Sequence, residues 1–228
     1  MFPLPSVYAW FHRAALALSL AGGLAVAGHA LAYSGDDAVA HMVSFGGNCP
    51  NCDLAGRRLV GAKFIGANFP GALLAGSDLR GAAFYGSNFN GANLSHSDVR
   101  GASMDGARFM LANFANAAMD GIEGHGLDLM DADLTRASLN SAELTGANLS
   151  RVHATEANFT NADLTAATMT DGVFNNADFR DATLTATSLQ GADLSHARNL
   201  TQHQVTEACS DSHTRLPPRL TPRLCGEK

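Results

Sequence analysis

Four cysteines are the residues of this 228-residue chain whose types and spacing point most directly to chemistry. Cys49 and Cys52 form a Cys-x-x-Cys pair, and Cys209 and Cys225 lie near the end of the chain. An even number of cysteines is typical of disulfide-bonded exported proteins, and four cysteines allow three connectivities. A Cys-x-x-Cys pair also suits thiol–disulfide exchange where a helix N-terminus lowers the pKa of the first thiol. Four thiolates are, in addition, a ligand set for zinc.

Three carboxylates recur at an interval of 20 residues: Glu123, Glu143 and Asp163. If that interval brings them side by side, they form a column of like charges, which costs free energy unless a cation or a basic partner relieves it. The alternative is a solvated polar face without a partner. Nothing in the sequence resembles a Ser-His-Asp array, a phosphate-binding loop or a glycosidase carboxylate pair. We therefore predict no catalytic residue, no cofactor and no metal site.

The elements that must position these residues come from a five-residue rhythm that runs from Asp53 to Arg198. Every fifth residue is large and apolar in nearly all units, beginning with Leu54 and Leu59, and Ala stands two residues earlier in most of them. Helices advance by 3.6 residues and strands by 2, so neither keeps every fifth residue on one face. A chain that bends after each five-residue unit can keep every fifth residue on the inner face. Four such units then make the four sides of a square coil of 20 residues. The sequence thus predicts an all-β solenoid of about seven coils.

This rhythm, Ala-(Asp/Asn)-(Leu/Phe)-x-x, resembles that of the pentapeptide-repeat family. The resemblance covers most of residues 49–225 and implies the fold of that family, a right-handed quadrilateral β-helix whose Ala and Leu or Phe point inward. Residues 20 apart then share a face, which predicts columns of aromatic rings inside the coil. Those columns are Phe69, Phe89 and Phe109, then Phe64 and Phe84, then Phe159 and Phe179.

Two units break the rhythm in a compensating way. Gly124 and Ala154 replace the large residue, and just there the preceding Ala becomes Ile122 and Val152, so that volume lost at one position returns at the other. We expect residues 121–127 to be the place most prone to a bulge or groove. Gly occupies most corners up to Gly106, which predicts type II turns there and more mixed corners afterwards.

Both ends of the repeat are expected to carry other structures. Residues 1–32 have the layout of a secretory signal peptide, with cleavage after Ala32, and residues 33–52 predict a short helical cap that includes the Cys-x-x-Cys pair. The repeat spans 53–198. Residues 199–228 predict a capping helix that opens at Thr201, followed by an irregular tail closed by Cys209 and Cys225.

The predicted coil determines which of the cysteine and histidine side chains can lie close together. It separates the two cysteine pairs, which excludes a shared zinc site and favours local disulfides. His96 and His196 would lie five coils, or about 24 Å, apart, too far to share a metal. His125 and His153 are interpreted as isolated, solvated residues.

Charge and composition narrow the function to a few hypotheses. The net charge of −6 is too mild to imply nucleic-acid or membrane partners. Residues 53–119 carry four acids and six bases, whereas 120–198 carry twelve acids and four bases. We predict a non-enzymatic, periplasmic or secreted structural or protein-interaction module with an unknown protein partner, as monomer or homodimer. The resemblance implies an alternative, a DNA mimic that acts on DNA gyrase through an acidic surface. A thiol–disulfide protein using Cys49 and Cys52 is the lesser alternative.

Overall fold

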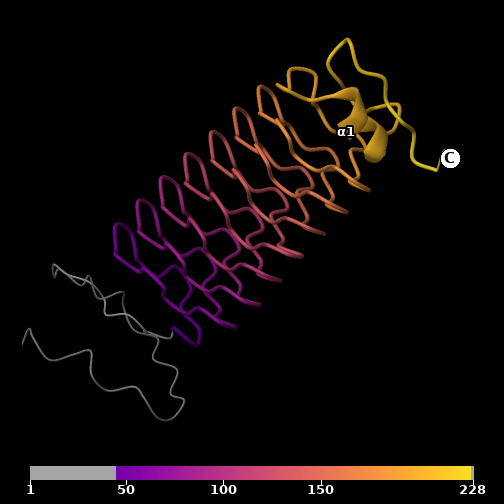
Figure 1. Cartoon of the computed structure of the whole chain (residues 1–228). Helices are drawn as coiled ribbons and strands as arrows, with labels where there is room; N and C mark the ends of the chain where they lie inside the picture. The colour runs from indigo at the N-terminus through magenta and orange to yellow at the C-terminus, as the bar shows by residue number, and fades with distance from the viewer. Residues whose placement is uncertain (1–44, 227–228) are drawn as a thin grey trace, which may run out of the picture. The chain divides into compact units, whose positions relative to one another are not determined.

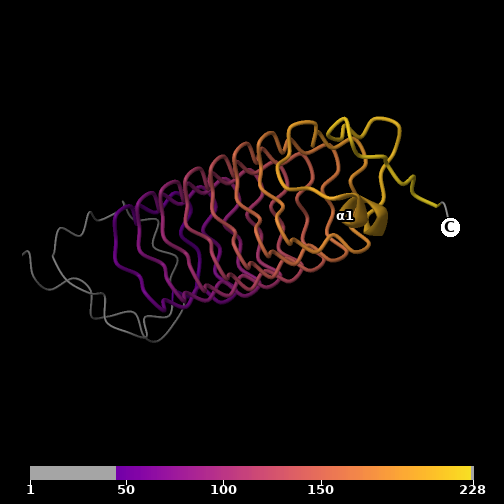
Figure 2. The same cartoon turned by 45° about the horizontal axis from the view of Figure 1, so that its top comes forward.

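The computed structural model describes residues 45–226, which form a stack of coils (Figures 1 and 2). Parallel bridges join residues 20 apart, from Asn48↔Asn68 to Asp178↔Arg198, without a slip in register. This is the period that the sequence predicts for a four-sided coil. Each side contributes a single bridged residue, so the described residues contain isolated bridges in place of longer strands. Among residues 45–226 the one helix is α1 (Gln202–Glu207).

The core is a continuous column inside the coil. The large residue of each unit and the Ala before it point inward, and nearly all of them are buried from Leu59 to Leu194. The predicted aromatic columns are confirmed. The rings of Phe69, Phe89 and Phe109 stack with centroids 5.5 and 5.2 Å apart, those of Phe64 and Phe84 lie 5.0 Å apart, and those of Phe159 and Phe179 lie 5.2 Å apart.

The corners are more uniform than the sequence indicates. In a typical corner the N–H of Ala62 donates to the carbonyl of Leu59, and Gly61 between them has a φ of 67°. A negative φ followed by a positive φ in a turn closed this way is the type II pattern. The positive φ persists at every corner from Asn51 to Gly191, including the many that lack glycine. The expectation of mixed corners after Gly106 was therefore wrong, because the inter-coil hydrogen bonds impose one backbone path on all units.

Leu111 shows the cost of that uniformity, and replacing it by glycine should stabilise the protein. Leu111 holds a φ of 59° with its side chain 66% exposed. A left-handed conformation costs a residue other than glycine about 1–2 kcal/mol, whereas glycine loses up to about 1 kcal/mol of extra chain entropy on folding. We expect Leu111→Gly to raise the free energy of unfolding by about 0.5–1 kcal/mol in urea titrations. Gly91→Leu, the reverse change one coil earlier, should lower it, and a destabilised Leu111→Gly variant would contradict this account.

The Asp or Asn that precedes the large residue has a structural role that sequence reasoning missed. Its side-chain oxygen accepts a hydrogen bond from the backbone N–H two residues later, as Asn93 does from Ser95 at 3.1 Å. That N–H lies in the corner and makes no hydrogen bond to a neighbouring coil, so the side chain satisfies an otherwise orphaned donor. The same bond is made by Asp53, Asp78, Asn88, Asp98, Asn113, Asp128, Asp133, Asn148, Asn158, Asp163, Asp178 and Asp193.

The units that break the rhythm do not break the coil. At Gly124 the ladder continues through Ser103↔Glu123 and Glu123↔Glu143, so the expected bulge at 121–127 is absent. A Cβ on Gly124 would lie 3.1 Å from the side chains of both Leu127 and Leu144. The buried Leu127 therefore fills the space that Gly124 leaves, in addition to the buried Ile122.

The C-terminal segment is more regular than the irregular tail predicted for it. Thr201 caps α1 through a reciprocal bond with Gln204, and the buried Gln204 side chain donates to the carbonyls of Phe179 and Ala182. After α1 the chain rejoins the ladders through Ser188↔Cys209 and Asp193↔Arg215. A last bridge, Ser210↔Leu224, covers this extra turn. The tail therefore extends the coil, with α1 standing in for one regular side.

The signal peptide predicted at 1–32 lies outside the described residues, as does most of the helical cap predicted within 33–52. The domain boundaries stay a prediction. No helix among residues 45–226 is long and apolar enough to cross a membrane.

Candidate interaction surface

The three carboxylates predicted to form a column lie in consecutive coils on one side of the stack. Bridges run from Ser103 through Glu123, Glu143 and Asp163 to Thr183, and all five residues face outward. We call Glu123, Glu143 and Asp163 the acidic ladder. Glu123 and Glu143 are exposed and Asp163 is half-buried. Their hydrogen bonds come from Ser103, Thr145 and Thr165, and His125 lies 3.6 Å from Glu143; none of these four residues carries a permanent positive charge.

The acidic ladder contains two kinds of carboxylate. Asp163 caps its own corner by accepting from the backbone N–H of Thr165 at 2.9 Å, and hydrogen bonds from Thr165 and Thr145 lower the pKa of its carboxyl. Glu123 and Glu143 make no such corner bond among the described residues, since their longer side chains extend away from the turn. The corner hydrogen bond thus gives Asp163 a role in the fold, whereas Glu123 and Glu143 have no such role at their corners.

His125 does not stand alone, which corrects the sequence interpretation. Its Nδ1 lies 3.0 Å from Oδ1 of Asp105 and its Nε2 lies 3.6 Å from a carboxylate oxygen of Glu143. The same Asp105 oxygen also accepts from the backbone N–H of His125 at 2.9 Å. Glu123 does not accept a hydrogen bond from that N–H, so Asp105, one coil earlier, accepts it instead. His125 is therefore held between two carboxylates at the edge of the acidic ladder.

Two carboxylates in the first half of the coil, those of Asp78 and Asp98, are each neutralised by a nearby arginine. Arg80 and Arg100 each donate two hydrogen bonds to Asp78 and Asp98, respectively, at 2.5–2.8 Å. The side-chain bond from the arginine is the main cause that lowers the pKa of each of these aspartates. By contrast, the side chains recorded against the acidic ladder are those of serine, threonine and histidine.

The other predicted residues stay apart. His96 occupies a left-handed corner, and His153 lies in the ladder between Asp133 and Val173. Within residues 45–226 no group of side chains is arranged to hold a metal ion.

The two cysteine pairs lie at bonding distance within each pair. The Cα atoms of Cys49 and Cys52 are 5.6 Å apart, and those of Cys209 and Cys225 are 4.8 Å apart. Cys49 and Cys52 flank Asn51, a left-handed corner at the start of the coil. Cys209 belongs to the ladder that ends the coil. The arrangement has the local pairing that the sequence favours, with the pairs at different ends of the stack.

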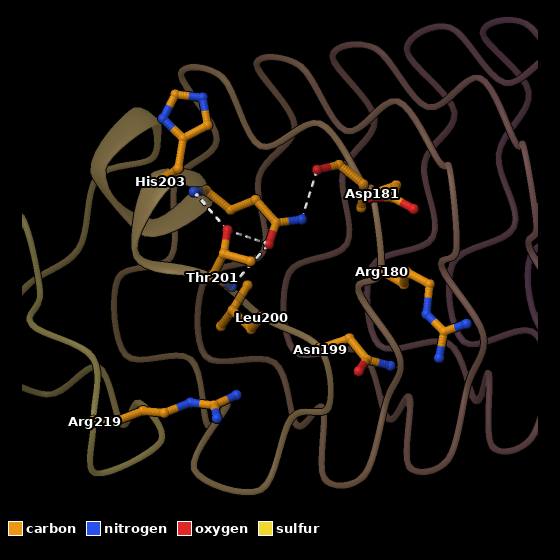
Figure 3. Close-up of a pocket in the computed structure, with 9 residues that line it drawn as sticks. Arg180, Asp181, Asn199, Leu200, Thr201, His203 and Arg219 are labelled. Carbon is orange, nitrogen blue, oxygen red and sulfur yellow. Dashed lines mark hydrogen bonds between the residues drawn. The ribbon is translucent and has the colours of Figure 1, made fainter.

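A hollow at the C-terminal end of the coil went unnoticed in the sequence. Arg180 and Asp181, from a regular corner, line it together with Asn199, His203 and Arg219 from the segment after the repeat (Figure 3). No spacing rule links residue 180 to residue 219, so only the folded chain brings these side chains to one place.

Comparison with protein families finds pentapeptide repeats along most of the coil. One model of pentapeptide repeats matches residues 52–95, 132–171 and 167–198, and a second matches residues 84–122. These matches support the right-handed β-helix solenoid that the repeat predicts. No curated protein matches the chain.

Several solved structures are similar at low identity. QnrB1, a plasmid-mediated fluoroquinolone resistance protein, is 19% identical over 75% of this chain and 95% of its own, with a TM-score of 0.39. HetL, a protein involved in heterocyst differentiation regulation from the cyanobacterium Nostoc, is 22% identical over 69% and 84%, with a TM-score of 0.22. A thylakoid-lumen protein of Arabidopsis thaliana is 23% identical over 70% and 82%, with a TM-score of 0.24.

Proposed function

Because the chain belongs to the pentapeptide-repeat family, whose models match most of residues 52–198, we propose that it is a non-enzymatic module that binds a protein partner. The partner-binding surface in this proposal is the acidic ladder with its flanking residue His125. The partner presents basic side chains, since unrelieved stacked carboxylates gain most from a cation.

The observation that carries this proposal is the difference between the glutamates and the aspartates of the coil. Aspartates at the equivalent position cap their own corners, and several are also paired with arginine. Glu123 and Glu143 do neither, and both side chains are exposed. When an exposed charged residue has no structural role, its presence is better explained by function than by folding.

The test removes these charges without changing the fold. We expect the double variant Glu123→Gln/Glu143→Gln to unfold within about 0.5 kcal/mol of wild type, because neither carboxylate holds a corner. In quantitative affinity capture from the native host, proteins retained by wild type should be lost by this variant. They should stay bound to Asp133→Asn, since asparagine can still cap the corner at Thr135. Equal capture by the wild type and the double variant would remove the acidic ladder from consideration.

We also propose that the protein is exported after removal of residues 1–32, and works in the periplasm or outside the cell. The support is the signal-like layout of those residues and the pairing geometry of the cysteines. Intact mass of protein recovered from host fractions tests this. A chain beginning near Tyr33 with both disulfides formed agrees with export, and an uncleaved, reduced cytoplasmic chain contradicts it.

An interaction with DNA gyrase is the second candidate. It is favoured by the excess of eight negative charges between residues 120 and 198. Inhibition of gyrase supercoiling by the purified protein would support it, and unaltered supercoiling at excess protein would eliminate it. A redox role for Cys49 and Cys52 is held third. It requires insulin-reduction activity that Cys49→Ser/Cys52→Ser abolishes.

A further inference from the structure

The hollow at the C-terminal end of the coil has the dimensions of a small-molecule site. Its volume is about 570 Å³, within the range of ligand pockets in proteins. The floor consists of the buried residues Ala182, Leu200 and Gln204. The rim is formed by exposed polar side chains from two segments that only the fold brings together.

The polar groups of the floor and one side are already engaged. Thr201 and Gln204 bond each other, and the amide nitrogen of Gln204 donates to Phe179 and Ala182. The side-chain nitrogen of Asn199 donates to Asp178 at 2.7 Å. Because these polar groups already bond within the protein, the charged side chains of the rim are the groups available to bind a ligand.

Two arginines on the rim have unused hydrogen-bonding capacity. Within the described residues, no hydrogen bond or ion pair engages the guanidinium group of Arg180 or Arg219. In contrast, Arg80, Arg100 and Arg151 are each paired with an aspartate. Since an arginine fork is built to hold a carboxylate with two parallel bonds, both rim arginines are suited to an anion from outside the chain.

The arrangement of the rim restricts the chemistry of that anion. Figure 3 shows Arg219 and Arg180 on opposite sides of Leu200 and Asn199, so each is left to pair with an anionic group of its own. Asp181 stands on the same rim and repels any anion, so it favours a ligand whose two negative charges are separated over one that concentrates them in a single group such as phosphate.

We propose that this hollow binds a ligand with two separated carboxylates, one held by Arg180 and the other by Arg219. Such a ligand is either a free organic diacid or a peptide with two nearby acidic side chains, which share the same chemistry. The site attracts the opposite charge to the acidic ladder, whose last bridge, Asp163↔Thr183, adjoins Ala182 of the hollow.

The experiment is a titration of the ¹⁵N-labelled full chain, followed by NMR chemical shifts. The probes are glutarate, acetate, the dimethyl ester of glutarate and the capped peptide Ac-Glu-Gly-Glu-NH₂. We expect glutarate or the peptide to shift Asn199, Thr201 and the side-chain N–H groups of both arginines with a Kd on the order of 1 mM, as exposed ion pairs are weak. Whichever of the two binds more tightly identifies the source of the carboxylates.

Matched variants separate this site from general charge effects. Arg219→Ala and Arg180→Ala should each weaken binding about fivefold. Arg108→Ala, which removes an exposed arginine elsewhere on the coil, should leave binding unchanged, as should Glu123→Gln/Glu143→Gln. The proposal is overturned if glutarate and the peptide cause no saturable shift at about ten times the expected Kd, if acetate binds equally well, or if Arg219→Ala binds like wild type.

Discussion

Replacing Phe89 by alanine should destabilise the protein by about 3–5 kcal/mol, the largest single effect we expect. Phe89 is fully buried and its ring contacts four others, at centroid distances of 5.4 Å to Phe64, 5.5 Å to Phe69, 5.2 Å to Phe84 and 5.2 Å to Phe109. Alanine removes the ring and leaves a cavity that the rigid coils on either side cannot close. Urea denaturation followed by circular dichroism measures the loss.

Two further variants give this prediction its controls. Phe89→Leu should cost less than about 1.5 kcal/mol, because leucine fills equivalent positions elsewhere in the same column, as Leu129 does. Tyr85→Ala removes an aromatic ring that is 40% exposed and should have a small effect. If Phe89→Ala proves no more destabilising than Tyr85→Ala, the stacked rings are not what stabilises this half of the coil.

Removing the C-terminal disulfide is expected to have the second largest effect. Cys209 and Cys225 are separated by 16 positions, and closing a loop of that size stabilises by about 3 kcal/mol in the chain-entropy model. The double variant Cys209→Ser/Cys225→Ser, which leaves no unpaired thiol at this end, should lose about that much under oxidising conditions. The loss should be local, because stacked repeats contact only their neighbours.

Hydrogen exchange gives the location of that effect. The amides of residues 209–224, whose bridges are made at Cys209, Arg215 and Leu224, should exchange faster in this variant. Amides in the middle of the coil should exchange at the same rate as in wild type. The disulfide between Cys49 and Cys52 closes a much shorter loop, so Cys49→Ser/Cys52→Ser should cost about 2 kcal/mol at the other end. Unchanged exchange at residues 209–224 would mean that the bridges and the bonds of Gln204 hold this end without the disulfide.

The acidic ladder shows how far a periodic sequence determines a surface. Its three members were predictable because residues 20 apart recur on one side of a four-sided coil. What separates Glu123 and Glu143 from Asp163 is a hydrogen bond to the corner, which depends on side-chain length and on the exact path of the turn. The sequence shows the column, and the structure shows which of its members the fold uses.

The core of this protein was determined by the sequence alone. The five-residue spacing of large apolar residues, with Ala two positions earlier, predicts the inward-facing column and the stacked phenylalanines, because each coil repeats the geometry of the previous one. The tertiary structure decided the rest. The left-handed corners at residues such as Leu111 follow from the ladder of hydrogen bonds between coils, not from local preference. His125 lies beside Asp105 because the two are one period apart, but its approach to Glu143 depends on the conformation of both side chains. Arg180 and Arg219 line one hollow only because the segment after the repeat returns to the last regular corners, an arrangement that no period predicts.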